Sequence, residues 1–351
     1  WIFLKFYEAG LVYRANAPVN WCPGCQTVLA NEQVLGDGTC ERSGDLVERR
    51  DMEQWFYRIT DYAQQLLDDL DTVDWPEKVK IMQRHWIGRS EGSEFGLPIA
   101  DAEGDARTDV EPLAVFTTRP DTSFGMTFAV ISPEHPRVDE LTTDDQRAAV
   151  DAFRASVAGR SDIERQSTEG SLDKRGVATG GRVVNPFTGQ AIPVFLADYV
   201  LMTYGTGAIM AVPGQDQRDW DFATAHGCDI IRTVQPPDDF DGEAYVGEGP
   251  AINSDFLDGM GVAEAKARAI EWLADGGIGA GKVNYRLRDW LLSRQRFWGC
   301  PIPIVYCDTC GEQPVSFDQL PVEAPDDVEF VPTGRSPLTD HQGFLTATCP
   351  S

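Results

Sequence analysis

The sequence predicts a mixed α/β protein with a strand-rich middle domain and two small cysteine modules. Three observations lead to this prediction. The 351 residues are 42% hydrophobic and 25% charged, which is enough chain for two or more domains with apolar cores. Short β-type runs separated by glycine and proline turns fill the middle of the chain. Two C-x-x-C pairs, Cys22–Cys25 and Cys307–Cys310, lie on either side of that stretch.

The composition excludes several other classes of protein. Eight cysteines, 33 Gly and 22 Pro in this length exclude a disulfide mini-protein, a coiled coil and a wholly disordered chain. No apolar run approaches the ~18 residues that a membrane span needs. Residues 1–5 show no Met, basic region or signal-peptide cleavage site, so we expect a chain cut from something longer, with cysteines that bind metal rather than form disulfides.

The charge of the chain is strongly acidic. The 30 Lys and Arg residues oppose 56 Asp and Glu residues, giving a net charge of −26. Because nucleic-acid binding depends on neutralising phosphates, this charge by itself argues against a nucleic-acid partner. Net charge reflects solubility more than fold, however, so specific motifs outweigh it.

The first part of the chain predicts two helices around a cysteine module. Residues 1–13 carry apolar side chains at helical spacing, and Gly10 supplies a stop. Residues 18–50 are rich in turns and contain three cysteines, which is typical of a metal ribbon. Residues 53–70 predict an amphipathic helix that ends before Trp75. Its apolar face comprises Trp55, Ile59, Tyr62, Leu66 and Leu70.

From about residue 94 the sequence predicts a strand-rich domain with two helices. One helix follows Thr143 and ends at Gly159, and the other spans about 262–275. Beyond this domain, residues 301–310 predict a strand leading to the second cysteine pair, and the acidic stretch 321–331 predicts a loop. The β-type runs are Leu113–Thr118, Phe128–Ile131, Ile192–Leu196 and Ala208–Val212.

The first cysteine pair predicts part of a zinc site. Two thiolates at C-x-x-C spacing, here Cys22 and Cys25, bind one tetrahedral zinc ion together with two further ligands. Cys40 is a third candidate, but Ser43 stands where a second C-x-x-C pair would place the fourth thiolate. The alternative is a module that keeps its fold and has lost its metal.

The second cysteine pair, Cys307 and Cys310, has Cys349 as its third candidate ligand. The C-x-x-C partner of Cys349 would fall at position 352, one beyond the sequence, which is again expected of a truncated chain. A rival arrangement joins both C-x-x-C pairs in one site, and the spacing leaves the two arrangements open. Cys228 and Cys300 lack spaced partners, so we expect them to be core thiols.

A polar segment follows the predicted strand that ends near Thr118. Thr117, Thr118, Arg119 and Thr122 offer hydroxyls and a guanidinium that suit a polar ester or a phosphate. The alternative is a strand that runs into an ordinary turn.

A second candidate segment is rich in glycine, runs from Tyr204 to Gly214 and is followed by Asp216 and Asp219. It lacks the P-loop pattern. Two carboxylates three residues apart are common at a solvated helix start. The functional interpretation is that they hold a cationic amine beside Tyr204 and Met210.

The stretch 286–299 alternates arginines with aromatic residues. Arg288, Arg294 and Arg296 suit contacts with phosphates and bases, and the alternative is a surface helix that packs its tryptophans. The four histidines are scattered, and both H-E-x-x-H and G-x-S-x-G are absent, so we expect neither a zinc protease nor a serine hydrolase.

The order of these motifs is more specific than any one of them. Over essentially its whole length the chain resembles the middle of bacterial leucyl-tRNA synthetases, which are class I enzymes. Isoleucyl and valyl enzymes share the general plan, but a zinc module before the editing insertion and the Thr-Thr-Arg-Pro-Asp-Thr segment favour the leucyl type. The segments that carry the resemblance are 17–23, 86–92, 117–122, 205–219 and 289–303.

The resemblance implies a domain layout. Residues 1–21 and 285–351 would belong to a split Rossmann-like catalytic core, with the second cysteine pair in the latter. Residues 22–52 would form a zinc-ribbon-like module, 53–93 a helical connection and linker, and 94–284 a mixed, β-barrel-like editing domain. The H-I-G-H and K-M-S-K-S motifs that bind ATP in this family are absent, so we expect this chain not to activate leucine alone.

The resemblance also implies a function and partners. In the parent enzyme, leucine is ligated to tRNA-Leu with ATP and Mg²⁺, and this piece hydrolyses tRNA-Leu that carries the wrong amino acid. The family is cytoplasmic, is expected to be monomeric, needs no membrane and allows a bound Zn²⁺. The alternatives are a non-catalytic module that binds tRNA or zinc, and an editing fragment of the isoleucyl or valyl type.

Site residues are carried over by position. Thr117 and Thr118 match hydroxyls that line the ester and the terminal adenosine, and Asp219 matches the aspartate that pairs with the α-ammonium; these three are the expected catalytic residues. Thr122 matches the threonine whose bulk excludes leucine. The surrounding pocket is expected to comprise Arg119, Tyr204, Met210 and Asp216. The sequence departs from the family at Gln215, where His is usual.

Overall fold

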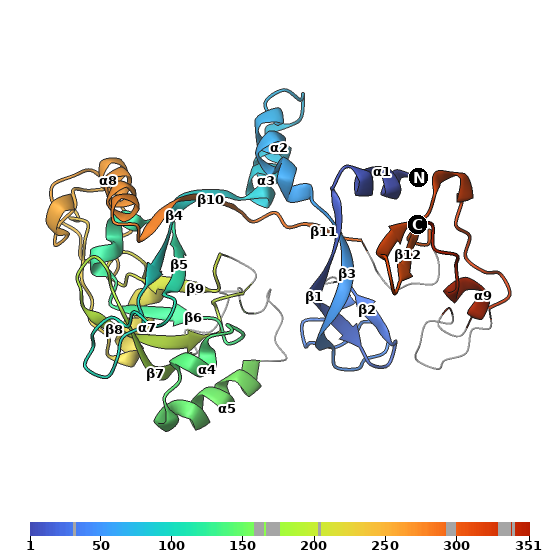
Figure 1. Ribbon diagram of the computed structural model, residues 1–351. Coiled ribbons are helices and arrows are strands. Elements are labelled where there is room, and N and C mark those ends of the chain that lie inside the picture. The colour runs from blue at the N-terminus through green and yellow to red at the C-terminus, as the bar shows by residue number, and fades with distance from the viewer. Residues whose placement is uncertain are drawn as a thin grey trace. The chain divides into compact units, whose positions relative to one another are not determined.

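The computed structural model describes residues 1–30, 33–157, 165, 176–202, 205–292, 300–328, 338 and 341–351. Helices alternate with several β-sheets, which confirms the mixed α/β class. The chain divides into two compact units (Figure 1): unit 1 comprises residues 1–87 and 287–351, and unit 2 comprises residues 88–286. No helix within the described ranges combines the length and apolarity that crossing a bilayer requires.

Unit 1 is built on a four-stranded sheet with the order β11-β3-β1-β2. Its centre is the antiparallel pair of β1 (Val12–Cys22) and β3 (Glu48–Tyr57). The other elements are α1 (Ile2–Glu8), β2 (Thr27–Leu29), η2 (Ile59–Tyr62), α2 (Ala63–Asp69), α3 (Glu77–Ile87), β11 (Trp290–Leu291), β12 (Ile304–Cys307), β13 (Gly311–Pro314), η6 (Phe317–Gln319) and α9 (Gln342–Leu345).

The helix predicted within residues 1–13 is confirmed over its first part as α1. Gly10, with φ +71°, follows the helix and directs the chain into β1. Phe3 of α1 packs edge-on against Trp55 of β3, with ring centroids 5.5 Å apart. This contact seals a small apolar cluster, which also includes Leu4, Val12 and Ile304.

The helix predicted over residues 53–70 is wrong in its first part. Residues up to Tyr57 belong to β3, and helical structure begins only at Ile59. Trp55 lies opposite Arg14 of β1 and is 4% exposed, so strand pairing and burial override the helical spacing. The stretch is then continued by η2 and α2.

The surface-helix alternative for the basic stretch does not apply where the structure describes it, because Trp290 and Leu291 form β11 against β3. Residues 293–299, with Arg294 and Arg296, lie outside the described residues. Cys300 is exposed rather than a core thiol, because it lies in a loop segment before β12, whereas Cys228 is half-buried.

The described residues of unit 2 form two sheets. In the first, β4 (Arg89–Leu97) pairs with both β10 (Gly279–Tyr285) and β5 (Leu113–Thr117). In the second, with the order β7-β8-β6-β9, β6 runs parallel to β8 and antiparallel to β9. The remaining elements are η3 (Pro120–Gly125), β6 (Phe128–Ile131), α4 (Val138–Leu141), η4 (Asp144–Gln146), α5 (Arg147–Val157), β7 (Gly176–Val184), β8 (Ala191–Ala197), β9 (Ala208–Ala211), α7 (Gln217–His226), η5 (Asp255–Leu257) and α8 (Val262–Asp275).

All four β-type runs and both helices predicted for this region are confirmed as β5, β6, β8, β9, α5 and α8. Gly159, the predicted end of α5, lies outside the described residues. On α8, Ala265, Ala269 and Leu273 are at most 1% exposed. They join a large apolar core that extends through both sheets and η3, and this core fixes the strand ends that carry the polar segments.

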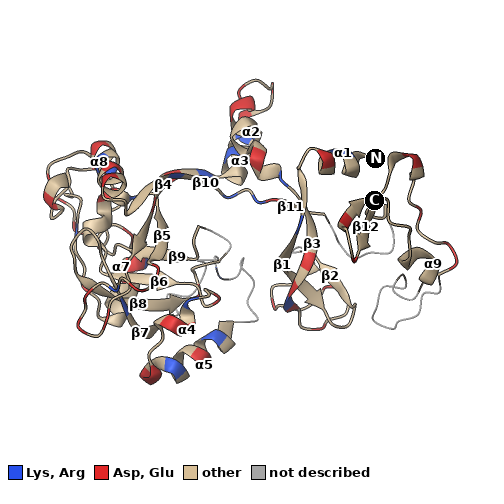
Figure 2. Cartoon of the chain, in the orientation of Figure 1, with Lys and Arg blue, Asp and Glu red and all other residues tan. Residues whose placement is uncertain are grey.

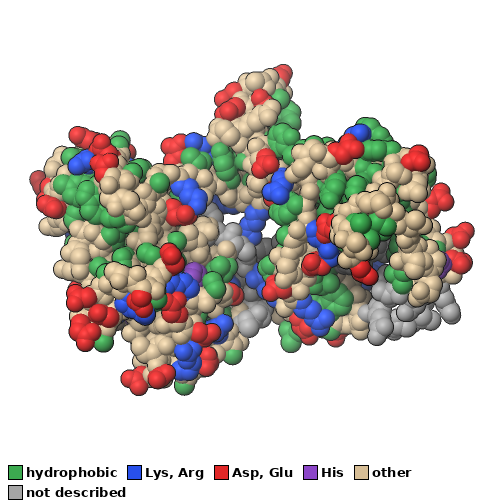
Figure 3. Space-filling view, in the orientation of Figure 1, with side chains coloured by type: hydrophobic (Ala, Val, Ile, Leu, Met, Phe, Trp, Pro, Cys, Tyr) green, Lys and Arg blue, Asp and Glu red, His purple; other side chains and the backbone are tan. Residues whose placement is uncertain are grey.

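Acidic residues lie on helices and loops of both units (Figure 2). On the face shown in Figure 3, they are interspersed with basic and apolar side chains. Several arginines are paired locally: Arg84 with Asp71, and Arg107 with Asp109. The surface is therefore not uniformly acidic, although the net charge of the chain is −26.

Candidate functional site

The threonine-rich segment forms a tight turn between β5 and η3. Thr117 is the last residue of β5, and its Oγ1 accepts a hydrogen bond from the backbone N–H of Arg119 at 3.0 Å. The hydroxyl and the backbone N–H of Thr122 both donate to the Arg119 carbonyl, at 2.8 and 3.0 Å. The turn is therefore fixed by its own threonines, and the rotamer of Thr122 is defined.

Arg119 is held by a residue that the sequence reasoning missed. Its guanidinium donates to both carboxylate oxygens of Asp121, with Nε 3.0 Å from Oδ1 and one terminal nitrogen 2.8 Å from Oδ2. Asp121 is 2% exposed, whereas the Arg119 side chain is 27% exposed. Two parallel hydrogen bonds fix the guanidinium plane at the site's edge. An Asp two residues after an Arg at a strand end was the available signal.

The two aspartates of the acidic segment have different tasks. Asp216 is the N-cap of α7, since its Oδ1 accepts from the backbone N–H groups of Arg218 and Asp219 at 2.8 and 3.2 Å. Asp219 lies in the first turn of α7 and is 5% exposed. Its Oδ2 accepts from the Val212 N–H at 2.8 Å. The helix-start interpretation thus describes Asp216, while Asp219 is a buried carboxylate at a helix N-terminus, where negative charge is stabilised.

The structure brings the two segments together inside unit 2. Strands β5 and β9 are neighbours, and the Ser123 hydroxyl of η3 lies 3.4 Å from the Met210 sulfur of β9. Thr122 has no exposed surface and Met210 is 6% exposed. A ligand therefore reaches Thr122 only if neighbouring side chains move. Tyr204 lies outside the described residues.

Tyr199 is a further residue near Asp219 that the sequence did not single out. Burial, and after it the charge of Asp219, raise the pKa of Tyr199 well above its usual value. Its hydroxyl is buried and finds no hydrogen-bond partner in the described part of the chain. Tyr199 therefore stays neutral near the carboxylate. No motif marks it, because only the fold brings it to α7.

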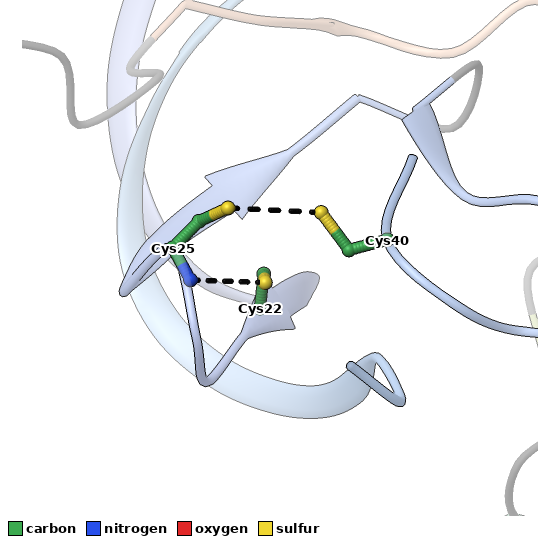
Figure 4. A group of neighbouring side chains, drawn as sticks. All are labelled: Cys22, Cys25 and Cys40. Atoms are coloured by element: carbon green, nitrogen blue, oxygen red, sulfur yellow. Dashed lines mark hydrogen bonds between the residues drawn. The ribbon is translucent and has the colours of Figure 1, made fainter. Parts of the chain in front are cut away.

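Six of the eight thiols form two separate groups of three, and not the mixed set of four. In the first, the sulfurs of Cys22, Cys25 and Cys40 lie within 4.8 Å of one another (Figure 4). Zinc bonds of 2.3 Å at tetrahedral angles place sulfurs about 3.8 Å apart, and Cys25 Sγ lies 3.8 Å from Cys40 Sγ. The Ser43 hydroxyl is 3.1 Å from Cys22 Sγ.

Ionisation within this first group is unequal. Burial, with hydrogen bonds to the other two thiols, raises the pKa of Cys25 to about 11. Burial also opposes ionisation of Cys40, but hydrogen bonds from the backbone N–H groups of Ser43 and Arg42 lower the pKa of that thiol to about 7. One thiolate is thus favoured before any metal binds, which suits a metal site.

The second group comprises Cys307, Cys310 and Cys349, whose sulfurs also lie within 4.8 Å of one another. Hydrogen bonds from the backbone N–H groups of Cys310 and Thr309 lower the pKa of Cys307. Hydrogen bonds with the other two thiols raise the pKa of Cys310 to about 11. The donor set fits a thiolate-bound metal ion, with a fourth ligand from elsewhere.

Asp289 anchors the start of the basic stretch in unit 1. The Tyr13 hydroxyl donates to its Oδ2 at 2.8 Å, and the Thr60 hydroxyl and N–H donate to its Oδ1. Burial, and then the hydrogen bond to Asp289, raise the pKa of Tyr13 to about 12. The backbone next to Arg288 is therefore held in place by the hydrogen bonds of Asp289.

Comparison with protein families gives two matches. A family described as "Leucyl-tRNA synthetase, editing domain" matches residues 84–274, and one described as "tRNA synthetases class I (I, L, M and V)" matches residues 1–91.

Individual proteins show the same similarity. The chain is 53% identical to a leucine–tRNA ligase of Nocardioides sp. and 51% identical to one of Clostridium perfringens, in each case over all of the chain and 42% of the relative. A crystal structure of the ternary complex LeuRS-tRNA-LeuAMS of Agrobacterium radiobacter K84 matches with a TM-score of 0.74 and 38% identity, covering 99% of this chain and 39% of that one. The chain thus spans about two fifths of the proteins it resembles.

Proposed function

Because the chain belongs to the leucyl-tRNA synthetase family, we propose that it carries the editing site, which hydrolyses tRNA-Leu charged with the wrong amino acid. The observation that carries this proposal is that Ser123, next to the threonine-rich turn, contacts Met210, while Val212, two residues further along, binds the buried Asp219 carboxylate. Ligation of leucine to tRNA-Leu, with ATP and Mg²⁺, then belongs to the longer parent enzyme.

A second, hydrolytic site is needed because a synthetic site can select amino acids by size only to a limited extent. A pocket discriminates one methylene by only ~1–3 kcal/mol, so the synthetic site admits amino acids similar to leucine. An editing pocket that refuses leucine and accepts its analogues removes these errors. Thr122 suits the refusing role because its hydroxyl is bonded to the Arg119 carbonyl, so the side chain holds one rotamer.

The remaining residues bind and orient the ester. The Asp219 carboxylate pairs with the α-ammonium of the aminoacyl group, with Asp216, Met210 and Tyr204 around it. The hydroxyls of Thr117 and Thr118 position the ester and the terminal adenosine, and Arg119 lies beside them. A water molecule oriented by the ribose hydroxyl attacks the carbonyl carbon. The bond from that carbon to the ribose oxygen breaks, and the proton passes to this oxygen.

The domain layout follows the family. We assign residues 1–21 and 285–351 to a split Rossmann-like core, 22–52 to a zinc-ribbon-like module, 53–93 to a connection and linker, and 94–284 to the editing domain. The parent is expected to be cytoplasmic and monomeric, with no membrane contact. Its tRNA-Leu would contact Arg288, Arg294 and Arg296, where the binding depends strongly on salt.

Two zinc ions are proposed in the first and last parts of the chain. Cys22, Cys25 and Cys40 would hold one ion, and Cys307, Cys310 and Cys349 the other. A zinc ion bound in either place supplies cross-linking of the backbone rather than catalysis. In the first group, the neutral hydroxyl of Ser43 is a weaker ligand than a thiolate.

Deacylation of purified tRNA-Leu tests the proposal directly. Incubated with this chain, isoleucyl-tRNA-Leu should lose its amino acid while leucyl-tRNA-Leu stays intact. If neither ester is hydrolysed by the chain or by the full-length parent, the chain is a non-catalytic module and the proposal is wrong. Hydrolysis of leucyl-tRNA-Leu would instead indicate an editing site of the isoleucyl or valyl type.

A further inference from the structure

Residues 231–233 touch both halves of the proposed editing site. One half is the threonine-rich turn with η3, and the other, acidic half is the turn that leads into α7. A Cβ atom placed on Gly125, the last residue of η3, would lie 2.8 Å from the Ile231 carbonyl oxygen and 2.9 Å from Thr233 Cγ2. A Cβ on Gly214, in the turn before α7, would overlap the same carbonyl and lie 2.8 Å from the Arg232 Cα. The segment is therefore seated against one glycine from each half.

A buried hydrogen bond joins this segment to the acidic half. The Thr233 hydroxyl donates to Gln215 Oε1 at 2.9 Å, and the two residues are 0% and 6% exposed. The backbone N–H groups of Gln215 and Asp216 both donate to the Val212 carbonyl, at 2.9 and 3.1 Å. The position of Gln215 is thus coupled to the turn that leads into the α7 cap.

The amide of Gln215 depends on Thr233. Its Nε2 is buried and meets no hydrogen-bond partner in the described ranges. Oε1 is therefore the end of this amide that is satisfied, and a buried acceptor that loses its donor is costly. Loss of the Thr233 hydroxyl would leave the whole amide unpaired and favour its displacement.

The segment is fixed on its other side as well. The Thr233 carbonyl accepts from the Ile252 N–H at 3.0 Å, and the Arg232 carbonyl accepts from Asn253 Nδ2 at 2.9 Å. The Arg232 guanidinium lies over the Trp220 ring of α7, 5.7 Å from its centroid. Residues 231–233 are thus held in place by these contacts, and they lie in space against both η3 and the turn before α7.

We propose that Thr233 and Gln215 are positioning residues of the editing site. Through residues 231–233 they set the spacing between Thr122 at the end of the threonine-rich turn and Asp219 on α7. Neither residue touches the substrate. This inference rests on the proposed function for its catalytic consequence, whereas its structural claim stands on the contacts above.

A matched pair of variants separates the hydroxyl from the shape of the side chain. Thr233→Val keeps both branches but removes the donor, and Thr233→Ser keeps the donor but removes the methyl near Gly125. With isoleucyl-tRNA-Leu, we expect Thr233→Val to lower kcat about tenfold, with a smaller change in KM. Thr233→Ser should restore kcat to within about twofold of the native chain.

Hydrogen exchange provides a readout that does not need activity. The Val212 N–H donates to Asp219, so its exchange rate reports whether α7 keeps its place. We expect exchange at Val212 to become about tenfold faster in Thr233→Val and to be unchanged in Thr233→Ser. Gln215→Met, which removes the amide at similar length, should behave as Thr233→Val does and serves if that variant does not fold.

The outcomes distinguish this inference from the proposed function. An active native chain, with kcat and Val212 exchange unchanged in Thr233→Val, overturns the positioning role alone. A lower melting temperature without either change shows a purely structural role and also overturns it. If neither the native chain nor the full-length parent hydrolyses either ester, the proposed function fails, and the exchange rates still decide whether Thr233 positions α7.

Discussion

The two units stabilise their functional groups in different ways. In unit 2, a continuous apolar core extends from β4 and β5 through the second sheet to α8, and the polar site lies at its strand ends. In unit 1, the buried residues form small separate clusters, one of which consists of Cys22, Leu29 and Cys40. Apolar packing positions the site in unit 2, whereas thiols occupy the place of a core in the cysteine module of unit 1.

Metal removal should affect the two units most differently. Structural zinc contributes about 10–16 kcal/mol of apparent binding energy in small modules, so a strong chelator should unfold the region around Cys22 and Cys40. Unit 2 should keep its structure because its core holds no metal ligand set among the described residues. Hydrogen exchange at Val28 and Leu29, compared with Val130 and Leu196, would measure the difference.

Cysteine variants provide the control for that experiment. Cys25→Ser should lower zinc content and reproduce the effect of the chelator, whereas Cys228→Ser should do neither. Cys228 is half-buried in unit 2 and belongs to neither thiol group. Equal zinc content and equal exchange in all three proteins would show that the first group does not bind structural zinc.

The same difference explains what the sequence could predict. In unit 2, short apolar runs between turn residues identify β5, β6, β8 and β9, because burial in one core demands that pattern. In unit 1, the spacing of Trp55, Ile59 and Tyr62 fits a helix, but pairing with β1 places Trp55 in β3. That pairing joins segments about forty residues apart, and local pattern does not report it.

The site was partly accessible from sequence for a related reason. Threonines and aspartates in short segments signal polar chemistry, so Thr117–Thr122 and Asp219 could be named. Tyr199 and Thr233 could not, because their roles arise from long-range packing. Asp121 stands two residues after Arg119, but that spacing alone does not show that the carboxylate is buried. Gln215 was noted only as a departure, and its hydrogen bond to Thr233 gives it a structural context.

Within unit 2, charge removal at Asp219 should have the next largest effect. Asp219→Asn keeps an oxygen that can accept from the Val212 N–H but loses the charge that would pair with the ammonium group. We expect isoleucyl-ester hydrolysis to fall by roughly 100-fold, as for loss of a partner from a buried charge pair. Single-turnover deacylation would measure it.

Asp216→Asn is the matched comparison, since Asn caps a helix as well as Asp does and this side chain is more exposed. Its loss should stay below tenfold. Equal losses in the two variants would mean that overall acidity, rather than the buried carboxylate, serves the site.

The smallest expected effect is a pH dependence of the stability of unit 2, which arises from the buried His135. Burial, and then Arg137, lower the pKa of His135, so the unfolded chain binds this proton more readily. The stability due to neutral His135 is complete above its unfolded pKa of about 6.5 and is lost as the pH falls below it. Denaturant unfolding between pH 7.5 and 5 would measure the slope.

His135→Asn should flatten that slope, because Asn can accept the Arg137 N–H as Nδ1 does and does not titrate. His226, whose pKa is also lowered by burial, should leave a residual slope. An identical pH profile in His135→Asn would show that this buried histidine does not contribute.

The most direct test of the account is leucyl-tRNA-Leu hydrolysis by Thr122→Ala and Thr122→Val. If the bulk of Thr122 excludes leucine, the alanine variant should hydrolyse the leucyl ester about 10- to 100-fold faster than the native chain, since one small group corresponds to ~1–3 kcal/mol. The valine variant keeps the bulk without the hydroxyl and should still spare leucine. An alanine variant that hydrolyses isoleucyl-tRNA-Leu normally and still spares leucyl-tRNA-Leu would contradict the assignment of this site.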